Sequence, residues 1–490
     1  MQYKLLISNL DPGFIRIESR FETRGESKLN LQLPSWRPGR YELANYAKNV
    51  RSFAAFDAQG NSLNWRKLSK DLWEINCVGQ AQILVTYEYW AQQYDAGASY
   101  INADMVYVNP VNCFMYVEGR ISEACTLELD VPDSYQIACQ LESDGKLLKA
   151  ESFDRLADSP FIASSALLHH QFEQQGCRYH FWVYGVSSFP FAQLEKDTRA
   201  YAEFQVNLFG DMPCKDYHFL YHILENRFRH GVEHADSTVI AMGPATELEQ
   251  PSFYNDFLAI SSHELFHLWN VKRIRPAEMW PYDFTRENYA ETGYMYEGVT
   301  TYYGDLALVR SGVWTEEQYL ESLSGDITRH LNNPGKDNYS LAMSSYDTWL
   351  DGYVPGVPGR KVSIYTEGLV AAWIADVFIL QSTHGKHRMD HVMQALYEST
   401  WKQGRGYRHK DIKHLMEEMS GLNFEDYFKD IIFGVGKFGD YLTKVLNLLG
   451  LVIERQVDDL QGISYRVAKN AEAGLAEQEL FAKWLVKAKI

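Results

Sequence analysis

The stretch His263-Glu264-Leu265-Phe266-His267 decides how this chain is interpreted, because it places two imidazoles and a carboxylate on one helical turn. Residues at i and i+4 share a helix face, so both histidines can reach one metal ion while Glu264 lies beside the open coordination position. This spacing is typical of zinc-binding helices in hydrolases. The sequence therefore predicts a helix at residues 257–269 that carries a hydrolytic metal site.

A hydrolytic zinc site usually has three protein ligands, so a third ligand is expected outside this helix. The extended metzincin pattern would require Gly at position 270 and His at position 273, and the chain has Asn270 and Arg273 instead. That class is excluded, which leaves a downstream carboxylate. The near candidates are Glu278, Glu287, Glu291 and Glu297.

Glu297 is the preferred third ligand because it opens a helical run at residues 297–306 that is poor in charge and rich in aromatic side chains. A carboxylate on a buried helix costs several kcal/mol unless a cation or hydrogen bonds neutralise it, whereas water suffices for the other three candidates in their polar connection. The alternative interpretation is a helix-start Glu stabilised by the helix dipole.

The composition indicates a globular protein with enough apolar mass for two or three cores: 490 residues, of which 46% are hydrophobic. A formal net charge of −17 argues against nucleic-acid and anionic-membrane partners, because their phosphates would repel it. We find no apolar run of membrane-spanning length and no secretory signal pattern, so we expect a cytoplasmic protein. The six cysteines lack paired metal-ligand spacing and are interpreted as reduced thiols.

The pattern of hydrophobic residues predicts an α+β protein in three segments. Residues 1–175 alternate apolar and polar side chains in short runs between turns, which is typical of an antiparallel β domain. Residues 176–440 are mainly helical, with helices expected at 197–209, 257–269, 294–309, 315–330, 367–380 and 391–401. Residues 351–360 are too rich in Gly and Pro for regular structure and are expected to form a loop. Residues 441–490 form a short C-terminal segment with a strand at 451–454 and an amphipathic stretch at 475–488.

Four sequence blocks resemble the glycyl aminopeptidases, gluzincin peptidases related to aminopeptidase N. They are residues 263–276, which hold the two histidines; residues 297–304; Gly231-Val232-Glu233-His234-Ala235-Asp236-Ser237-Thr238; and Leu33-Pro34-Ser35-Trp36-Arg37-Pro38-Gly39-Arg40-Tyr41. The resemblance covers residues 1 to about 450 and implies a β domain followed by a thermolysin-like zinc peptidase domain. Many members of the family continue into a PDZ domain. The roughly fifty residues after Tyr441 are too few for one, so a truncated PDZ-like module is expected there.

Carried over residue by residue, the resemblance implies that His263, His267 and Glu297 bind Zn²⁺ and that Glu264 is the general base. It also implies that Glu233 binds the substrate's free α-ammonium. From its polar neighbours alone, Glu233 would be interpreted as a surface carboxylate.

Tyr365 resembles the tyrosine that stabilises the oxyanion in related aminopeptidases, at the start of a helix. The alternative is an amphipathic aromatic side chain on the wall of the cleft. Glu367 stands where the family has a lysine, so the charge expected next to Tyr365 differs from that of the family.

The expected function is a zinc aminopeptidase that removes N-terminal residues, with a family preference for Gly and Ala, from peptides with a free N-terminus. Two alternatives stay open: a zinc endopeptidase or other zinc hydrolase on the same fold, and a non-catalytic binding protein.

Overall fold

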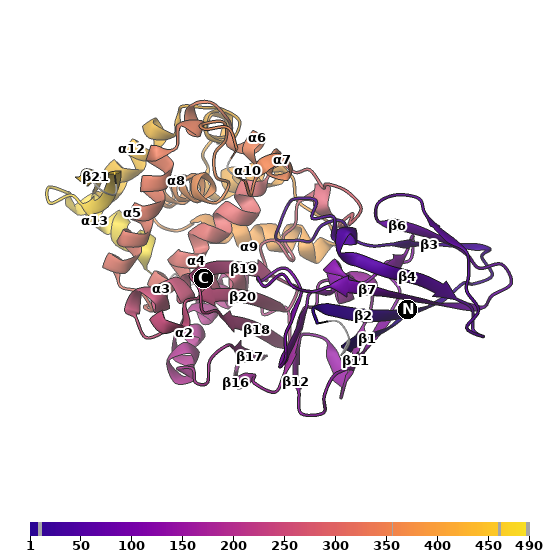
Figure 1. Cartoon of the computed structure of the whole chain (residues 1–490). Helices are drawn as coiled ribbons and strands as arrows, with labels where there is room; N and C mark the ends of the chain where they lie inside the picture. Colours follow the sequence, from indigo (N-terminus) through magenta and orange to yellow (C-terminus); the bar gives the residue numbers. More distant parts are fainter. Residues whose placement is uncertain (8–11, 355, 459–461, 487–490) are drawn as a thin grey trace.

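The computed structural model describes residues 1–7, 12–354, 356–458 and 462–486. It has a β-rich N-terminal part and a mainly helical C-terminal part (Figure 1). This arrangement confirms the predicted α+β class with a β domain first.

The N-terminal part contains three sheets, with strand orders β13-β14-β11-β1-β2-β7-β4, β10-β3-β6-β5 and β12-β15-β9-β8. Pairing is antiparallel except between β1 and β11, which are parallel. Alternate residues of the long strand β2, such as Ile15 and Ile17, point into one apolar core, as the sequence alternation predicted. The strands are β1 (Gln2–Ile7), β2 (Phe14–Glu22), β3 (Lys28–Gln32), β4 (Val50–Phe56), β5 (Trp65–Lys67), β6 (Leu72–Asn76), β7 (Gln82–Trp90), β8 (Tyr100–Ile101), β9 (Met105–Val108), β10 (Tyr116–Val117), β11 (Cys125–Asp130), β12 (Gln136–Cys139), β13 (Glu142–Asp144), β14 (Leu147–Ala150) and β15 (Phe161–Ser164), with helix α1 (Phe153–Ala157).

A five-stranded sheet begins the second part, in the order β16-β17-β18-β20-β19. Strands β17, β18 and β20 run parallel, and β16 and β19 pair antiparallel at the two edges. Strand β16 therefore belongs to this sheet, although its residues lie in the segment expected to form the N-terminal β domain. The strands are β16 (Leu168–Gln174), β17 (Cys177–Tyr184), β18 (Asp216–Ile223), β19 (Phe228–Glu233) and β20 (Ser237–Gly243).

Helices form the rest of the second part, and each of the six helices expected from the sequence is present, with shifted ends. The helices are α2 (Phe191–Phe209), α3 (Pro251–Phe266), the π-helical turn η5 (Tyr294–Gly298), α4 (Val299–Arg310), α5 (Glu316–Asn332), α6 (Leu341–Tyr346), α7 (Thr348–Asp351), α8 (Thr366–Ser382), α9 (Met389–Ser399), α10 (His409–Ser420), α11 (Glu425–Tyr427), a second π-helical turn η8 (Phe428–Ile432), α12 (Phe438–Leu449) and α13 (Leu475–Leu485). Residues 352–354 and 356–365 connect α7 to α8 without regular structure, as expected for the Gly- and Pro-rich stretch.

The end of η5 and the start of α8 cross in close contact because both helices carry glycine there. A Cβ atom on Gly298 would lie 2.3 Å from the Cα atom of Gly368. Side chains at either position would push the helices apart. The crossing places Glu297, just before one glycine, near Tyr365, just before α8.

The described residues of the C-terminal segment pack on the helical part and have no separate core, and their resemblance to a truncated PDZ-like module stays a prediction. Strands β21 (Leu451–Asp458) and β22 (Gly462–Lys469) make a hairpin whose buried residue Val467 joins the core of the helical part. Trp484 of α13 is fully buried in the same core, and its indole donates a hydrogen bond to the Tyr302 hydroxyl of α4 (2.8 Å). Ala488, the last apolar position of the amphipathic stretch, lies outside the described residues.

No helix among the described residues is both long and apolar enough to cross a membrane.

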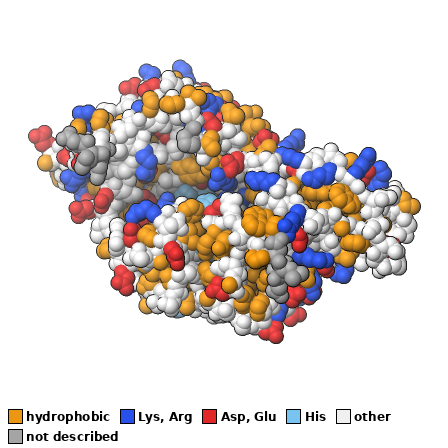
Figure 2. Space-filling model, in the orientation of Figure 1, with side chains coloured by type: hydrophobic (Ala, Val, Ile, Leu, Met, Phe, Trp, Pro, Cys, Tyr) orange, Lys and Arg blue, Asp and Glu red, His pale blue; other side chains and the backbone are white. Residues whose placement is uncertain are grey.

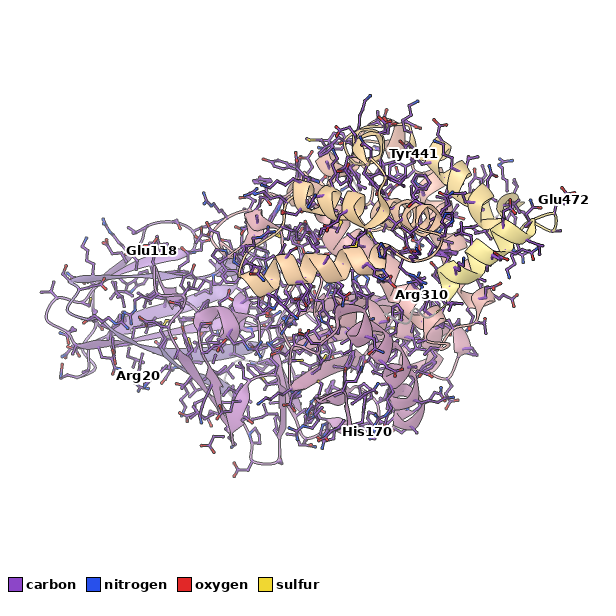
Figure 3. All side chains as sticks on the ribbon, turned by 180° about the vertical axis from the view of Figure 1, so that it is seen from behind. Arg20, Glu118, His170, Arg310, Tyr441 and Glu472 are labelled. Atoms are coloured by element: carbon purple, nitrogen blue, oxygen red, sulfur yellow. The ribbon has the colours of Figure 1, made fainter. Side chains whose placement is uncertain are left out.

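Arg310, the last residue of α4, ties the C-terminal segment to the helical core (Figure 3). Its guanidinium donates to Asp390 at 3.0 and 3.1 Å, to Asp376 at 3.4 Å and to the carbonyl oxygen of Trp484 at 2.6 and 2.9 Å. All three charged side chains are inaccessible to solvent.

Arg310→Met should therefore lower the free energy of unfolding by about 3–5 kcal/mol, because it leaves two buried carboxylates without their cation. Urea denaturation followed by circular dichroism would measure the change. Arg66→Met is the control, since the Arg66 side chain is 67% exposed beside Glu74 and its loss should matter by less than about 1 kcal/mol. Equal losses in the two variants would contradict the anchoring role of Arg310.

Candidate active site

A cavity of about 840 Å³ lies between the edge strand β19 and helices α3, α4 and α5, and it reaches the start of α8. Figure 2 shows histidine atoms at the bottom of a hollow on this face, with Lys and Arg side chains near its rim. The six site residues expected from the sequence all line this cavity: Glu233, His263, Glu264, His267, Glu297 and Tyr365.

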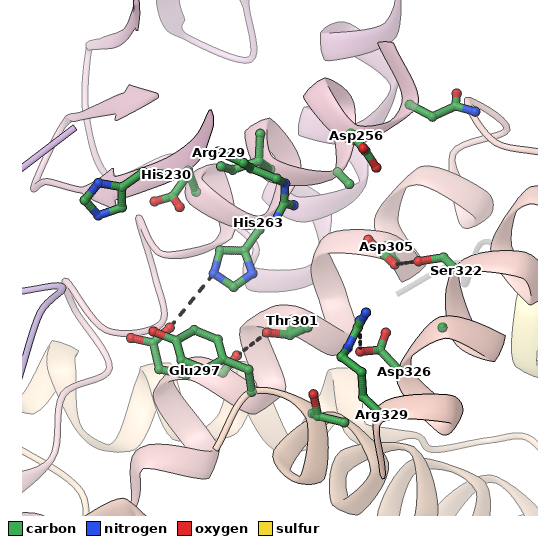
Figure 4. A pocket seen from close by; sticks show the side chains of 18 of the residues that line it. Arg229, His230, Asp256, His263, Glu297, Thr301, Asp305, Ser322, Asp326 and Arg329 are labelled. Carbon is green, nitrogen blue, oxygen red and sulfur yellow. Dashed lines mark hydrogen bonds and ion pairs between the residues drawn. The ribbon is translucent and has the colours of Figure 1, made fainter. Parts of the chain in front are cut away.

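The two histidines and Glu297 converge on one point. The Nε2 atoms of His263 and His267 are 3.1 Å apart, and Glu297 Oε2 lies 3.9 Å from the first and 3.5 Å from the second. Figure 4 shows His263 facing Glu297 across the cavity. Helix α3 supplies His263, and His267 is the residue that caps its C-terminal end. The π-helical turn η5 supplies the carboxylate, and such turns frequently occur at functional sites.

These distances suit a tetrahedral metal ion. Ligand atoms at about 2.0–2.1 Å from zinc lie about 3.3–3.4 Å from one another in a tetrahedron, close to the separations in this cluster. Two imidazole nitrogens and a carboxylate oxygen are also ligand types that zinc prefers. His263, His267 and Glu297 could therefore hold such an ion.

Hydrogen bonds behind the cluster orient His267. Its Nδ1 atom lies 2.6 Å from the Asn270 carbonyl oxygen, so an Nδ1–H donor leaves the Nε2 lone pair facing the cluster. The Asn270 side chain donates in turn to the carbonyl oxygen of Met295 (2.7 Å) and to the Thr300 hydroxyl (3.0 Å). Asn270 thus connects the turn that follows α3 with η5 and α4. The sequence analysis missed this role because it used Asn270 only to exclude the metzincin class.

The site concentrates negative charge with little solvent. Burial raises the pKa of Glu264 to about 8, with His267 opposing the rise and the carboxylates of Glu233 and Glu297 reinforcing it. Burial acts to lower the pKa of His267, but contact with Glu297 outweighs it and raises that pKa to about 9. Burial and the neighbouring imidazole hold the pKa of His263 well below its usual range. A metal cation would replace the proton shared by these groups and would favour the ionised form of Glu264.

Glu264 fits beside β19 because residue 231 has no side chain. A Cβ atom on Gly231 would lie 2.1 Å from Glu264 Oε1. The other carboxylate oxygen, Oε2, is buried without a hydrogen-bond partner. An oxygen in this state is available to a water molecule or a substrate in the cavity.

Glu233, at the end of β19, is not a surface carboxylate. It is 3% exposed, and its Oε1 atom is buried without a hydrogen-bond partner. Carboxylate oxygens of Glu233 and Glu264 and a nitrogen of His267 lie within 4.8 Å of one another, so Glu233 borders the same centre.

Tyr365 lines the cavity immediately before α8, whereas Glu367 does not line it. Glu367 is fully buried, accepts a hydrogen bond from the backbone N–H of Ser363 (3.1 Å) and lies 3.5 Å from His330. Glu367 therefore holds the chain at the start of α8 through this hydrogen bond, outside the cavity.

The three competing carboxylates lie outside the cavity. Glu278 is paired with Arg408, Glu291 lies 3.6 Å from His409, and Glu287 belongs to the polar connection before η5. The burial argument for Glu297 thus selected the carboxylate that the structure brings to the histidines.

The fold and this cluster define the class of protein, a metal-dependent peptidase. One family model, described as the Peptidase M61 N-terminal domain, matches residues 2–165, and another, described as M61 glycyl aminopeptidase, matches residues 256–371. The chain belongs to this glycyl aminopeptidase family and is a peptidase. A search of curated proteins found no match.

Solved structures share the fold. An aminopeptidase N family protein from Idiomarina loihiensis superposes with a TM-score of 0.88 at 24% identity, over 96% of this chain and 82% of that chain. An M1 zinc metallopeptidase from Deinococcus radiodurans, a mutant bound to a Tyr-Ser-Ala substrate, superposes with a TM-score of 0.51 at 13% identity, over 91% and 92%. At these identities the likeness concerns the fold.

Glu297→Gln should weaken metal retention by at least about 100-fold, because it removes a charged ligand, whereas Glu264→Gln should retain the metal. Metal content after dialysis against a weak chelator would measure both, with Glu291→Gln as the control outside the cavity. The opposite result, metal lost with Glu264→Gln and kept with Glu297→Gln, would assign the metal to Glu233, Glu264 and His267, the second group of potential ligands here.

Proposed function

We propose that this chain is a zinc aminopeptidase that removes small N-terminal residues, Gly and Ala, from peptides. One observation carries the proposal: a buried carboxylate with an unpartnered oxygen, Glu233, borders the same centre as the three potential zinc ligands. His263, His267 and Glu297 would hold a zinc ion there, which would polarise the carbonyl group of the scissile bond and lower the pKa of a water molecule.

Each cavity residue then has a task. Glu264, with its free oxygen, accepts a proton from the attacking water and later delivers it to the leaving amine. The hydroxyl of Tyr365 donates a hydrogen bond to the oxyanion that develops on the carbonyl oxygen. His263, His267 and Glu297 hold the metal, and the carbonyl oxygen of Asn270 fixes the ring of His267.

Glu233 supplies the selection for a free N-terminus. Its buried carboxylate pairs with the α-ammonium of the first residue, and an internal peptide segment would leave that charge unpaired. Binding therefore rewards one end of a peptide and penalises its middle, which makes the enzyme an exopeptidase.

The proposed compartment is the cytoplasm. All six cysteines are free thiols, as expected for a reducing compartment. The description of the matching family, glycyl aminopeptidase, supports the preference for Gly, and the preference for Ala is part of the proposal. Initial rates on a panel of aminoacyl amides, each with a free and an N-acetylated amine, would test activity, exopeptidase character and side-chain preference together.

Tyr365→Phe should lower kcat by about 10²- to 10³-fold with little change in KM, because its hydrogen bond strengthens mainly in the transition state. Steady-state kinetics on a glycyl amide would measure both constants. Tyr346→Phe, a partly exposed tyrosine outside the cavity, is the control. An unchanged kcat would remove Tyr365 from the mechanism.

Glu233→Gln should lower kcat/KM for free-amine substrates by at least about 10²-fold, because a buried charge-assisted pair with the ammonium is lost. Metal content and thermal stability should stay near those of the unaltered protein. Glu249→Gln, which changes an exposed carboxylate, is the control. Equal losses on free and N-acetylated substrates would indicate a structural role for Glu233 and would favour an endopeptidase.

A further inference from the structure

Residues 33–41 of the N-terminal part, one of the four blocks singled out in the sequence, have no role in the chemistry above. They leave the β-rich part and contact the C-terminal part. The backbone N–H of Ser35 donates to the carbonyl oxygen of Phe284 (2.8 Å), and the indole of Trp36 donates to that of Asp283 (2.7 Å). The Trp36 ring also packs edge-on against Trp349 at 4.9 Å. Residues 35 and 36 thus fix this segment to the C-terminal part.

The tip of this segment rests on the carboxylate of Glu233. Gly39 has φ +78°, and a Cβ atom built on it would lie 2.4 Å from Glu233 Oε2. Only glycine satisfies both conditions, because other residues rarely adopt this backbone conformation and any side chain would displace the carboxylate.

The residues around Gly39 hold other parts of the site. The side chain of Arg37 lies 3.4 Å from His230 Nε2, on the strand that carries Glu233. The backbone N–H of Tyr41 donates to the Tyr353 hydroxyl (3.1 Å), and the Tyr41 ring packs 5.0 Å from Tyr296, the residue before Glu297. The tip is therefore braced between the strand of Glu233 and the helical turn of Glu297.

The cavity is asymmetric about the metal ligands. On the side away from Glu233 it continues along α3 and α5, past Asp256, Gln318 and Asp326. Figure 4 shows this continuation through Asp305 and Arg329. On the side of Glu233, Gly39 is the one described residue of the N-terminal part that lines the cavity. One end of a substrate has room to extend, and the other end meets Gly39.

We propose that residues 36–41 close the cavity behind Glu233, so that one residue with a primary amine fits upstream of the cleaved bond, and that Gly39 is the position that determines this limit. The inference rests on the proposed function, since it assumes that Glu233 receives the α-ammonium. It adds a second criterion: Glu233 selects the charge of the amine, and the Gly39 backbone limits the space around it.

A substrate with a methylated amine distinguishes the effect of the positive charge from the effect of the size of the amine. Sarcosyl amide carries one methyl group more than glycyl amide and keeps the positive charge, whereas N-acetylglycyl amide loses the charge and is larger. The purified zinc-loaded protein should cleave sarcosyl amide with a kcat/KM at least about 10-fold below that of glycyl amide, a loss of the size that one misplaced methyl group causes in a tight pocket. Equal rates on the two charged substrates would overturn the proposal and leave the role of Glu233 untouched.

Variants of Gly39 test whether this residue sets the steric limit on the amine end of the substrate. Gly39→Ala should lower kcat/KM for glycyl amide by at least about 10-fold with metal retained, because Glu233 must move. Gly119→Ala is the matched control. Gly119 lies in the same N-terminal part at φ +77°, so an alanine there causes the same backbone strain as at position 39. Its Cβ atom would have no atom within 4 Å, so this control contains no steric clash. Its activity should stay unchanged.

The same substitution in the Glu233→Gln protein reveals whether Gly39 acts through that carboxylate. We expect Gly39→Ala to add less than about a 3-fold loss there, because the group it displaces has already lost its charge. A full multiplicative loss in the double variant would overturn the positioning role of Gly39.

If Glu233→Gln alone keeps the preference for free amines, the proposed function fails, and the comparison of sarcosyl amide with glycyl amide still decides whether the cavity is closed. That comparison also decides the proposal if Gly39→Ala does not fold.

Discussion

Three buried carboxylates in one cavity are the constraint on which this structure depends. Glu233, Glu264 and Glu297 are each at most 5% exposed, and two of them have an oxygen without any partner. Such a group of like charges is unfavourable unless protons or cations neutralise it, since each buried charge without a partner costs several kcal/mol. A divalent metal and the ammonium of a substrate would together balance three negative charges. The same residues would thus favour a metal cation and an ammonium group as ligands of this cavity.

The packing of the protein keeps these carboxylates together although they come from different elements. Each one lies where a glycine permits a close approach: Glu264 against Gly231, Glu297 beside the crossing at Gly298, and Glu233 against Gly39. The buried Arg310 network then fixes α4, the helix that follows Glu297, to the last helix of the chain. Because interiors are densely packed, a displacement in one of these elements is passed to the others. The position of the charges is therefore a property of the whole C-terminal part together with one segment of the N-terminal part.

The sequence predicted the features that depend on local periodicity and on the chemistry of single residues. The helix with His263 and His267 follows from their spacing, and Glu297 follows from the cost of a carboxylate on an apolar helix. Features that depend on distant contacts were missed. The alternating pattern of β16 predicts a strand but does not reveal which sheet the strand joins. The packing of the C-terminal segment depends on the contacts of Trp484 with a core formed by residues distant in sequence. The contact of Gly39 with Glu233 joins residues almost two hundred positions apart, which no local pattern reveals.

The N-terminal part therefore contributes to specificity as well as to the fold. An anion alone rewards an ammonium group, but it does not prevent a longer chain from passing when other contacts compensate. A closed end of the cavity prevents a longer chain from binding in this way, because the steric clash persists whatever contacts the chain makes elsewhere. In this structure the attractive element comes from the edge strand β19 and the repulsive one from a loop of the other part. Because the attractive and the repulsive element lie on separate parts, substitutions in residues 36–41 can alter the shape of the amine pocket. The positions of the metal ligands and of Glu264 stay unchanged by such substitutions.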